Sequence, residues 1–161
     1  MGVIEETAFV REAQEMLGGM YRLSMSILRR REDAQDAVQQ AMLRAWERRA
    51  QAREATFRGW LTRIVINECR NIQRARMRVV PMDELPERPA PAQADDGALA
   101  VAMDALAEKL RTPLLLRYME GFTEKEIAQA LGITLPAVKS RLHRARRALR
   151  EELGDSEVTF E

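Results

Sequence analysis

Apolar side chains recur every three or four residues over most of this 161-residue chain, which is the period of an amphipathic α-helix. The clearest example is the segment 33–46, which is apolar on one side and polar on the other. Its apolar members are Ala34, Ala37, Val38, Ala41, Met42, Ala45 and Trp46. Similar patterns predict helices at 9–17 and 20–28, and a longer helix that follows the polar connection 47–56 and extends to Arg78. The chain is therefore predicted to be all-α.

The segment 123–150 predicts two helices joined by a tight turn. Thr123 and Glu126 fit a capping box, in which a hydroxyl and a carboxylate satisfy free backbone N–H groups at a helix start. Gly132 stands where the chain must turn with a positive φ, and Thr134 is placed to cap the next helix. The buried stripe of that second helix is expected to comprise Val138, Leu142, Ala145 and Leu149. This arrangement is typical of a helix-turn-helix.

The second helix of this pair carries six cations and no carboxylate between residues 139 and 150. They are Lys139, Arg141, Arg144, Arg146, Arg147 and Arg150. Such a helix repels itself unless it meets an anion, and DNA phosphate is the natural partner because each neutralised phosphate releases condensed counterions. A helix of this width also fits the major groove. The alternative is a solvated, Arg-rich amphipathic helix, which the preceding turn of helix-turn-helix length disfavours.

Charge and proline divide the chain, although its net charge is only +1. Residues 79–98 contain one cation, five acids and four prolines, and they show no helical period. This segment is predicted to be a semi-extended acidic linker. We therefore expect two small helical domains, 1–78 and 99–155, joined by the Pro-rich linker 79–98 and followed by a frayed tail at 156–161.

Several classes of function find no support in the sequence. The single cysteine, Cys69, cannot form an internal disulfide, and with one histidine it cannot build a metal cluster, so no metal or cofactor is expected. Cys69 is predicted to be a small buried residue. We find no paired carboxylates, partnered nucleophile or phosphate loop, and the pair Gly18-Gly19 offers only flexibility, so neither an enzyme nor a small-molecule substrate is predicted. The apolar runs are too short to cross a bilayer and no leader opens the chain, so we expect a cytoplasmic protein.

Three segments together resemble the extracytoplasmic-function (ECF) sigma factors of bacterial RNA polymerase. The core-polymerase-binding helix of that family resembles DAQDAVQQAMLRAW (33–46), and its promoter-melting segment resembles FRGWLTRIVINECRNIQRAR (57–76). Its second DNA-binding domain resembles LRYMEGFTEKEIAQALGITLPAVKSRLHRARRALREEL (116–153). The order of the three segments and the Pro-rich linker between the second and the third also agree with the pattern of that family. The resemblance implies a subunit that binds core RNA polymerase and promoter DNA, initiates transcription, and is held inactive by an anti-sigma factor.

The resemblance also implies roles for residues of the first domain. Polymerase binding is expected on the polar side of the 33–46 helix, at Asp33, Asp36, Gln39 and Gln40. Recognition and opening of the minus-ten element are expected at Asn67, Arg70, Arg74 and Arg76, because clustered cations suit the backbone of a separated strand. An unstacked base is expected in a pocket formed by the loop 47–56. Trp60 fits either a core position or a wedge that separates the strands.

In the second domain the resemblance implies that the minus-thirty-five element is read as duplex DNA. The expected groove-facing residues are Lys139, Ser140, His143 and Arg144. Arg141, Arg146 and Arg147 are expected to contact phosphate. Pro136 and Ala137 replace the family's common Gly-Thr, which removes a hydroxyl able to hold phosphate. A helix-turn-helix regulator that binds operators without polymerase remains the alternative, but it leaves the pattern at 33–78 without a purpose.

Overall fold

The computed structural model describes residues 2–79 and 97–154, and within these ranges the protein is helical with no β-strand beyond an isolated bridge between Val3 and Arg53. The prediction of an all-α fold is confirmed. The α-helices are α1 (Glu6–Leu28), α2 (Arg31–Glu47), α3 (Phe57–Val79), α4 (Gly97–Ala105), α5 (Glu108–Tyr118), α6 (Glu124–Leu131) and α7 (Leu135–Leu153). Two short 3-10 turns, η1 (Arg49–Gln51) and η2 (Glu54–Thr56), connect α2 to α3. No described helix is long and apolar enough to cross a bilayer.

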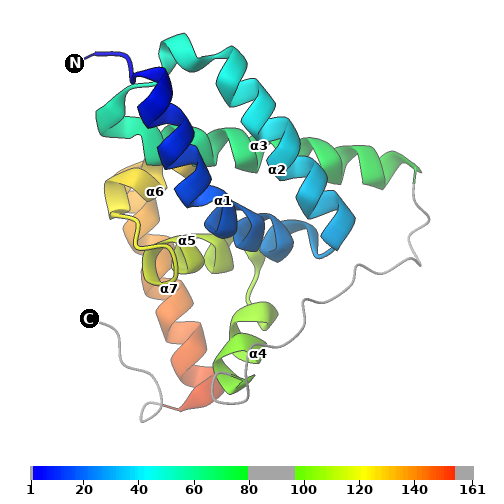
Figure 1. Cartoon of the computed structure of the whole chain (residues 1–161). Coiled ribbons are helices and arrows are strands. Elements are labelled where there is room, and N and C mark those ends of the chain that lie inside the picture. Colours follow the sequence, from blue (N-terminus) through cyan, green and yellow to red (C-terminus); the bar gives the residue numbers. More distant parts are fainter. Residues whose placement is uncertain (1, 80–96, 155–161) are drawn as a thin grey trace.

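The first three helices pack on one another, and we call them the N-terminal helices (Figure 1). Their core contains the fully buried side chains of Leu23, Leu61 and Val65. The predicted stripe of α2 is buried at Ala34, Ala37, Val38, Ala41 and Ala45 and half-buried at Met42, because small side chains there let α2 approach α1 and α3 closely. The prediction was wrong for Trp46, the last member of that stripe, because its side chain is 38% exposed.

α1 is a single helix where the sequence predicted a break at Gly18-Gly19. The helix continues through both glycines and ends at Arg29, which adopts a left-handed conformation with φ of 60° and donates its N–H to the carbonyl of Met25. Gly19 is buried and Gly18 is exposed. The two glycines are therefore not a flexible joint. Gly19 instead lies close to the carboxylate of Glu120, in the other half of the chain.

The helix-turn-helix forms as its local signals predict. Thr123 Oγ1 accepts from the N–H of Glu126 at 3.1 Å, and the carboxylate of Glu126 accepts from the N–H of Thr123 at 2.8 Å. Gly132 has φ of 66°, and Thr134 caps α7 by accepting from the N–H of Ala137 at 3.2 Å. The predicted stripe of α7 is buried to 1% exposure or less at Val138, Leu142, Ala145 and Leu149.

We call α4 to α7 the C-terminal helices, and they lie directly on the N-terminal helices. α6 packs along α3, and α5 packs against α1 (Figure 1). Leu114, Leu116 and Ile127 join the buried cluster that the N-terminal helices form. α7 extends away from α3, with α4 beside its far end.

The predicted linker 79–98 lies mostly outside the described residues, which omit 80–96. Its two ends are helical, because α3 extends through Val79 and α4 begins at Gly97. The predicted tail 156–161 also falls outside the described residues, and α7 ends at Leu153.

Candidate nucleic-acid and polymerase interfaces

One candidate interface is the outer side of α7. The residues predicted to face the groove are all exposed: Lys139, Ser140, His143 and Arg144. They lie opposite the buried stripe, so packing of the helix on its neighbours turns them outward. The arrangement presents cations and hydrogen-bond donors along one side of a helix, which suits the guanine edge and the phosphates beside it.

The three arginines predicted to contact phosphate flank this side. Arg141 and Arg146 are half-buried, and Arg147 is exposed. Arg146 donates to the hydroxyl of Tyr118 at 2.9 Å, and Arg147 lies 3.6 Å from Glu151 one turn later. The Arg147 pair is solvated on both sides and contributes little, so it leaves the guanidinium available to a stronger anion.

The end of α3 forms a second candidate interface, and each of its predicted cations has a partner within the chain. Arg70 is paired with Glu108 of α5 at 2.7 Å. Arg74 donates to the side chain of Asn71, and Arg76 is paired with Asp33 of α2. Asn67 is exposed. The predicted residues Asn67, Arg70 and Arg74 line one hollow with Arg63, Ile66 and Asn71, and the wall opposite is made by Ala130, Leu131 and Gly132 of the helix-turn-helix.

The polar side of α2 is the third candidate interface. Asp36, Gln39 and Gln40 are exposed, and Leu43 beside them is 58% exposed. Asp33 does not share this open surface, because its carboxylate is paired with Arg76 and its side chain is only 14% exposed. The structure therefore brings together two residues that the sequence assigned to different sites. Another pair, between Arg44 and the buried Glu68, fixes α2 against α3.

The loop between α2 and α3 is held against the start of the chain. The N–H of Ile4 donates to the carbonyl of Ala52 at 3.0 Å, and Ala52 is fully buried. Trp60 is half-buried, with its ring 5.8 Å from Phe57 and 6.4 Å from Phe9. Trp60 therefore packs beside the core with part of its surface exposed, and its role as a wedge stays a prediction.

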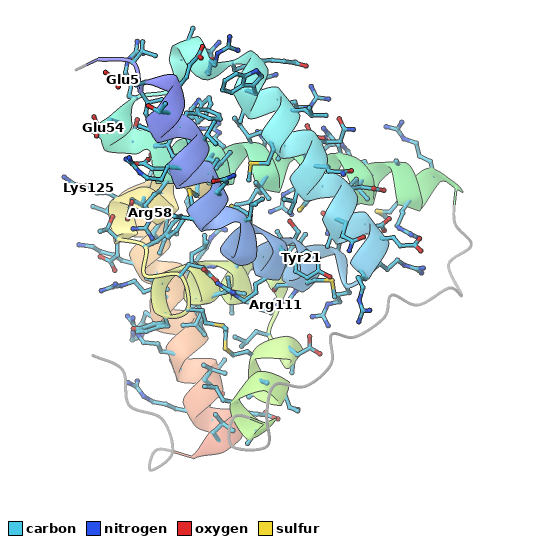
Figure 2. All side chains as sticks on the ribbon, in the orientation of Figure 1. Glu5, Tyr21, Glu54, Arg58, Arg111 and Lys125 are labelled. Carbon is cyan, nitrogen blue, oxygen red and sulfur yellow. The ribbon has the colours of Figure 1, made fainter. Side chains whose placement is uncertain are left out.

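Several polar residues that the sequence did not single out lie between the two sets of helices. Arg58, near the start of α3, lies beside α6 in Figure 2, and its guanidinium is 4.4 Å from the centre of the Phe122 ring. Arg111 is buried, and its desolvation lowers the pKa of the guanidinium. Hydrogen bonding to Glu120 raises the pKa of Arg22. The sequence marks these contacts only weakly, since Arg22, Arg58 and Arg111 are ordinary charges on amphipathic helices.

Cys69 is buried on α3, as predicted. Its thiol donates to the hydroxyl of Ser24 at 3.5 Å. Burial raises the pKa of the thiol to about 11, because a thiolate would lose its hydration there. Neither this cysteine nor any other group of the described residues forms a cluster suited to a metal ion.

The fold and these surfaces define a helical DNA-binding protein of the sigma-70 type. The model of Sigma-70 region 2 matches residues 13–79, and that of Sigma-70, region 4 matches residues 96–149. The chain is 36% identical over 159 residues to the RNA polymerase sigma-E factor of Streptomyces coelicolor, with 94% of this chain and 87% of that protein covered. It is 33% identical over 147 residues to the ECF RNA polymerase sigma factor SigE of Mycolicibacterium smegmatis, of which it spans 57%.

Solved structures of other sigma factors are also similar to this chain. The sigma factor RpoE of Bartonella quintana, in complex with the anti-sigma factor NepR, matches with a TM-score of 0.78 at 25% identity over 92% of this chain and 98% of that one. CnrH in complex with the cytosolic domain of CnrY matches with a TM-score of 0.68 at 25% identity, over 96% and 92% of the chains. The chain belongs to the ECF sigma factors of RNA polymerase.

Proposed function

We propose that this chain binds core RNA polymerase and directs promoter-specific transcription initiation. The observation that carries the proposal is the outer side of α7, where Lys139, His143 and Arg144 are exposed on a helix whose opposite stripe is buried. That side fits the major groove of the minus-thirty-five element. Lys139, Ser140, His143 and Arg144 read base edges, and Arg141, Arg146 and Arg147 hold phosphates.

The minus-ten element is bound by the end of α3. Asn67 and Arg74 are exposed there, and Arg70 lies between them on the same hollow. Cations at this spacing follow the backbone of a separated strand, with Arg76 extending the series. The loop 47–56 receives the unstacked base beside a hollow lined by Val3, Ile4, Glu6, Phe9, Glu47, Arg49 and Ala50.

Core polymerase is bound by the polar side of α2. Asp36, Gln39 and Gln40 are exposed there and supply acceptors and donors to the partner. Asp33 acts differently from the other three: its ion pair with Arg76 orients α2 against α3. The two DNA-binding domains, 1–78 and 99–155, are joined by the linker 79–98, so that binding of one promoter element raises the effective concentration of the other contact.

The protein works by binding energy and carries out no catalysis of its own. It acts in the cytoplasm, where core polymerase and promoter DNA are found. An anti-sigma factor controls it, and the support for this is the likeness to RpoE, which was solved with the anti-sigma factor NepR. Such a partner covers surfaces that polymerase or promoter DNA needs.

Co-purification with bacterial core RNA polymerase, followed by transcription from a promoter library, tests the proposal. We expect a stable complex that initiates from a restricted set of promoters sharing two short elements. A chain that binds duplex DNA but ignores core polymerase would instead be a stand-alone regulator. Half-site symmetry in the selected DNA would support that outcome, because regulators of this type bind as symmetric dimers.

A further inference from the structure

A row of basic side chains runs along α7 beside its buried stripe. Its members lie four, three and four residues apart, which places them on one line of a helix. They are Lys139, His143, Arg146 and Arg150. Arg146 is half-buried, because Leu142 one turn before it and Leu149 one turn after it belong to the buried stripe. Side chains at the flank of a helix in the major groove meet the phosphates beside it, so Arg146 stands where a phosphate contact is expected.

Arg146 is held in place from outside α7. Its Nη1 donates to the hydroxyl of Tyr118 at 2.9 Å, and Tyr118 is the last residue of α5. Tyr118 is 38% exposed and Met119 after it is 55% exposed, so this contact lies at the surface of the protein. Among the described residues no carboxylate pairs with Arg146. An anion from outside can therefore approach the guanidinium without displacing an acid of the chain.

Tyr118 is itself well anchored. The guanidinium of Arg117 lies 5.9 Å from the centre of the tyrosine ring, within the range of a cation–π contact. Arg117 also donates to the carbonyl of Phe122 at 3.4 Å, and Phe122 is only 2% exposed. A tyrosine side chain has two rotatable bonds, whereas an arginine loses far more rotamer freedom when it is ordered. A rigid residue of α5 thus holds a flexible residue of α7.

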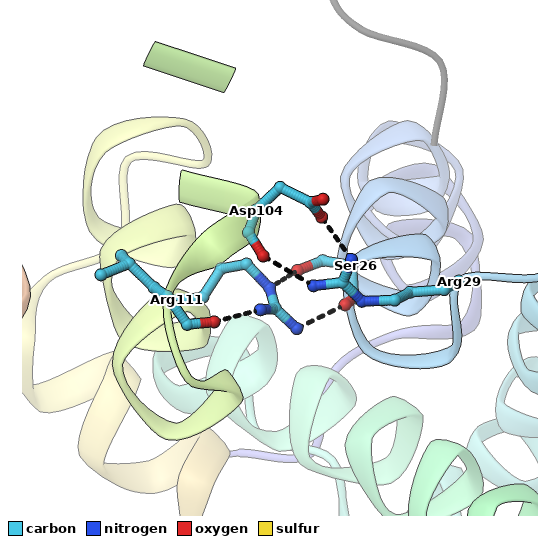
Figure 3. A network of polar contacts seen from close by, with 5 residues as sticks. Ser26, Arg29, Asp104 and Arg111 are labelled. Carbon is cyan, nitrogen blue, oxygen red and sulfur yellow. Dashed lines mark hydrogen bonds and ion pairs between the residues drawn. The ribbon is translucent and has the colours of Figure 1, made fainter. Parts of the chain in front are cut away.

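Arg111 shows how the same chain uses an arginine that only joins helices. It donates to the hydroxyl and the carbonyl of Ser26, each at 2.8 Å, and to the carbonyl of Leu106 at 2.6 Å (Figure 3). All three of its nitrogens are used, and the residue is 6% exposed. Arg146 gives one nitrogen to Tyr118 and keeps two others that can donate to the oxygens of a phosphate.

We propose that Tyr118 positions Arg146 on a phosphate beside the minus-thirty-five element, so that the end of α5 contributes to promoter binding through α7. The inference rests on the proposed function of α7. Because Tyr118 orders the arginine before DNA arrives, less conformational entropy is lost when the complex forms. A phosphate is the same beside every base pair, so this contribution strengthens binding without changing which sequence is preferred.

The first test removes the hydroxyl and keeps the ring. Tyr118→Phe in the full chain is compared with the wild type by anisotropy, on fluorescent minus-thirty-five duplexes that differ from one another at single base pairs. Binding is expected to weaken about threefold on every duplex, as one less ordered side chain predicts. Tyr21→Phe removes a hydroxyl from a half-buried tyrosine of α1 and is expected to behave as the wild type. No loss for Tyr118→Phe, or a loss that depends on the base pair, would overturn the proposal.

The salt dependence tells a positioning role from a merely structural one. Arg146→Ala should lower the slope of log K against log salt by about 0.9, because one phosphate contact is lost. Tyr118→Phe changes no charge, yet its slope should fall in the same direction, since an arginine that is not held neutralises the phosphate less fully. Weaker binding with the slope of the wild type would overturn the role of Tyr118 in the phosphate contact.

A double-mutant cycle tests whether Tyr118 acts through Arg146. Tyr118→Phe is expected to cause no further loss of duplex affinity in an Arg146→Ala background, because the residue that it positions is gone. Equal losses in the wild type and in that background would mean that the two residues act independently, and the proposal would be wrong.

The variant with Lys139→Ala and Arg144→Ala, measured alongside, separates this proposal from the proposed function. Weaker binding by that variant, with none for Tyr118→Phe, would overturn the role of Tyr118 and leave α7 as the surface that contacts DNA. If neither that variant nor Arg146→Ala changed duplex binding, α7 would not be the contact surface, and the proposed function of α7 would fail together with the role of Tyr118.

Discussion

α3 and α7 are both long basic helices, yet cations of α3 are paired with carboxylates, whereas those of α7 are mostly open to solvent. α3 lies between α1 and α2 on one side and α6 on the other, and its Arg70 and Arg76 are paired with carboxylates from other helices. α7 packs on α4, α5 and α6 and leaves Lys139 and Arg144 exposed. The comparison teaches that the packing around a basic helix, rather than its composition, decides whether its cations are open to solvent or paired with carboxylates of the same chain.

The difference follows from where each helix keeps its apolar residues. α7 has one narrow buried stripe, so half of its surface remains open. α3 buries Leu61 and Val65 in the N-terminal core and places Gly59 against Gln129 of α6. A helix packed on two sides has little free surface, and the ends of its charged side chains become available to neighbouring acids.

The largest effect is expected on α7. Lys139→Ala with Arg144→Ala is predicted to weaken binding to duplex promoter DNA by about 100-fold or more, because each lost base contact costs about 1–3 kcal/mol. Anisotropy with a fluorescent minus-thirty-five duplex selected from the library measures this. Arg11→Ala with Lys109→Ala removes the same charge from exposed positions elsewhere and should have a small effect. A matching loss of polymerase affinity would contradict the assignment of α7 to DNA.

Arg111 tests what holds α5 against α1. Arg111→Met is predicted to lower the free energy of unfolding by about 3 kcal/mol, since it removes the charged hydrogen bonds that the buried guanidinium donates to the half-buried Ser26 and to the carbonyl of Leu106. Urea denaturation followed by circular dichroism provides the measurement. Arg11→Met on the exposed side of α1 should change stability by no more than about 0.5 kcal/mol. Equal stability of the two variants would show that the hydrogen bonds of Arg111 do not anchor α5 on α1.

The sequence was a good guide where the signals are local. The capping box of Thr123 and Glu126, the positive φ of Gly132 and the buried stripe of α7 each depend on residues within one or two turns of each other. These features were predicted correctly because backbone hydrogen bonding and helical periodicity act over that range. The all-α fold follows from the same patterns.

Contacts between distant segments were missed because nothing local marks them. Glu108 and Arg70 lie 38 residues apart, and the sequence shows each only as an ordinary charge on an amphipathic helix. Asp33 was assigned to polymerase and Arg76 to DNA, but they pair with each other across 43 residues. Gly18-Gly19 was interpreted as flexibility because a glycine's need for space is visible only once its neighbour, here Glu120, is known.

Cys69 tests how well the side of α3 that faces the core is shielded from water. Burial raises the pKa of its thiol to about 11, so the unfolded chain ionises first as pH rises. The contribution of neutral Cys69 to stability is complete below the ordinary thiol pKa and is lost as pH rises toward 11, by about 2–3 kcal/mol in total. Denaturation at several pH values should show this fall in the wild type relative to Cys69→Ala. Identical pH profiles would mean that the thiol is reached by water.

The smallest effect is expected on α2, whose polar side is open while α3 is covered. Asp36→Ala with Gln39→Ala is predicted to weaken binding to core polymerase about tenfold, as loss of a few polar contacts at an interface does. Duplex binding by α7 should not change. The same factor is expected in a background of Lys139→Ala with Arg144→Ala, because the two surfaces lie on different helices and independent sites have additive free energies. A tenfold loss in the wild type that disappears in that background would show that the surfaces on α2 and α7 are coupled, and the two surfaces could then not be engaged in separate steps.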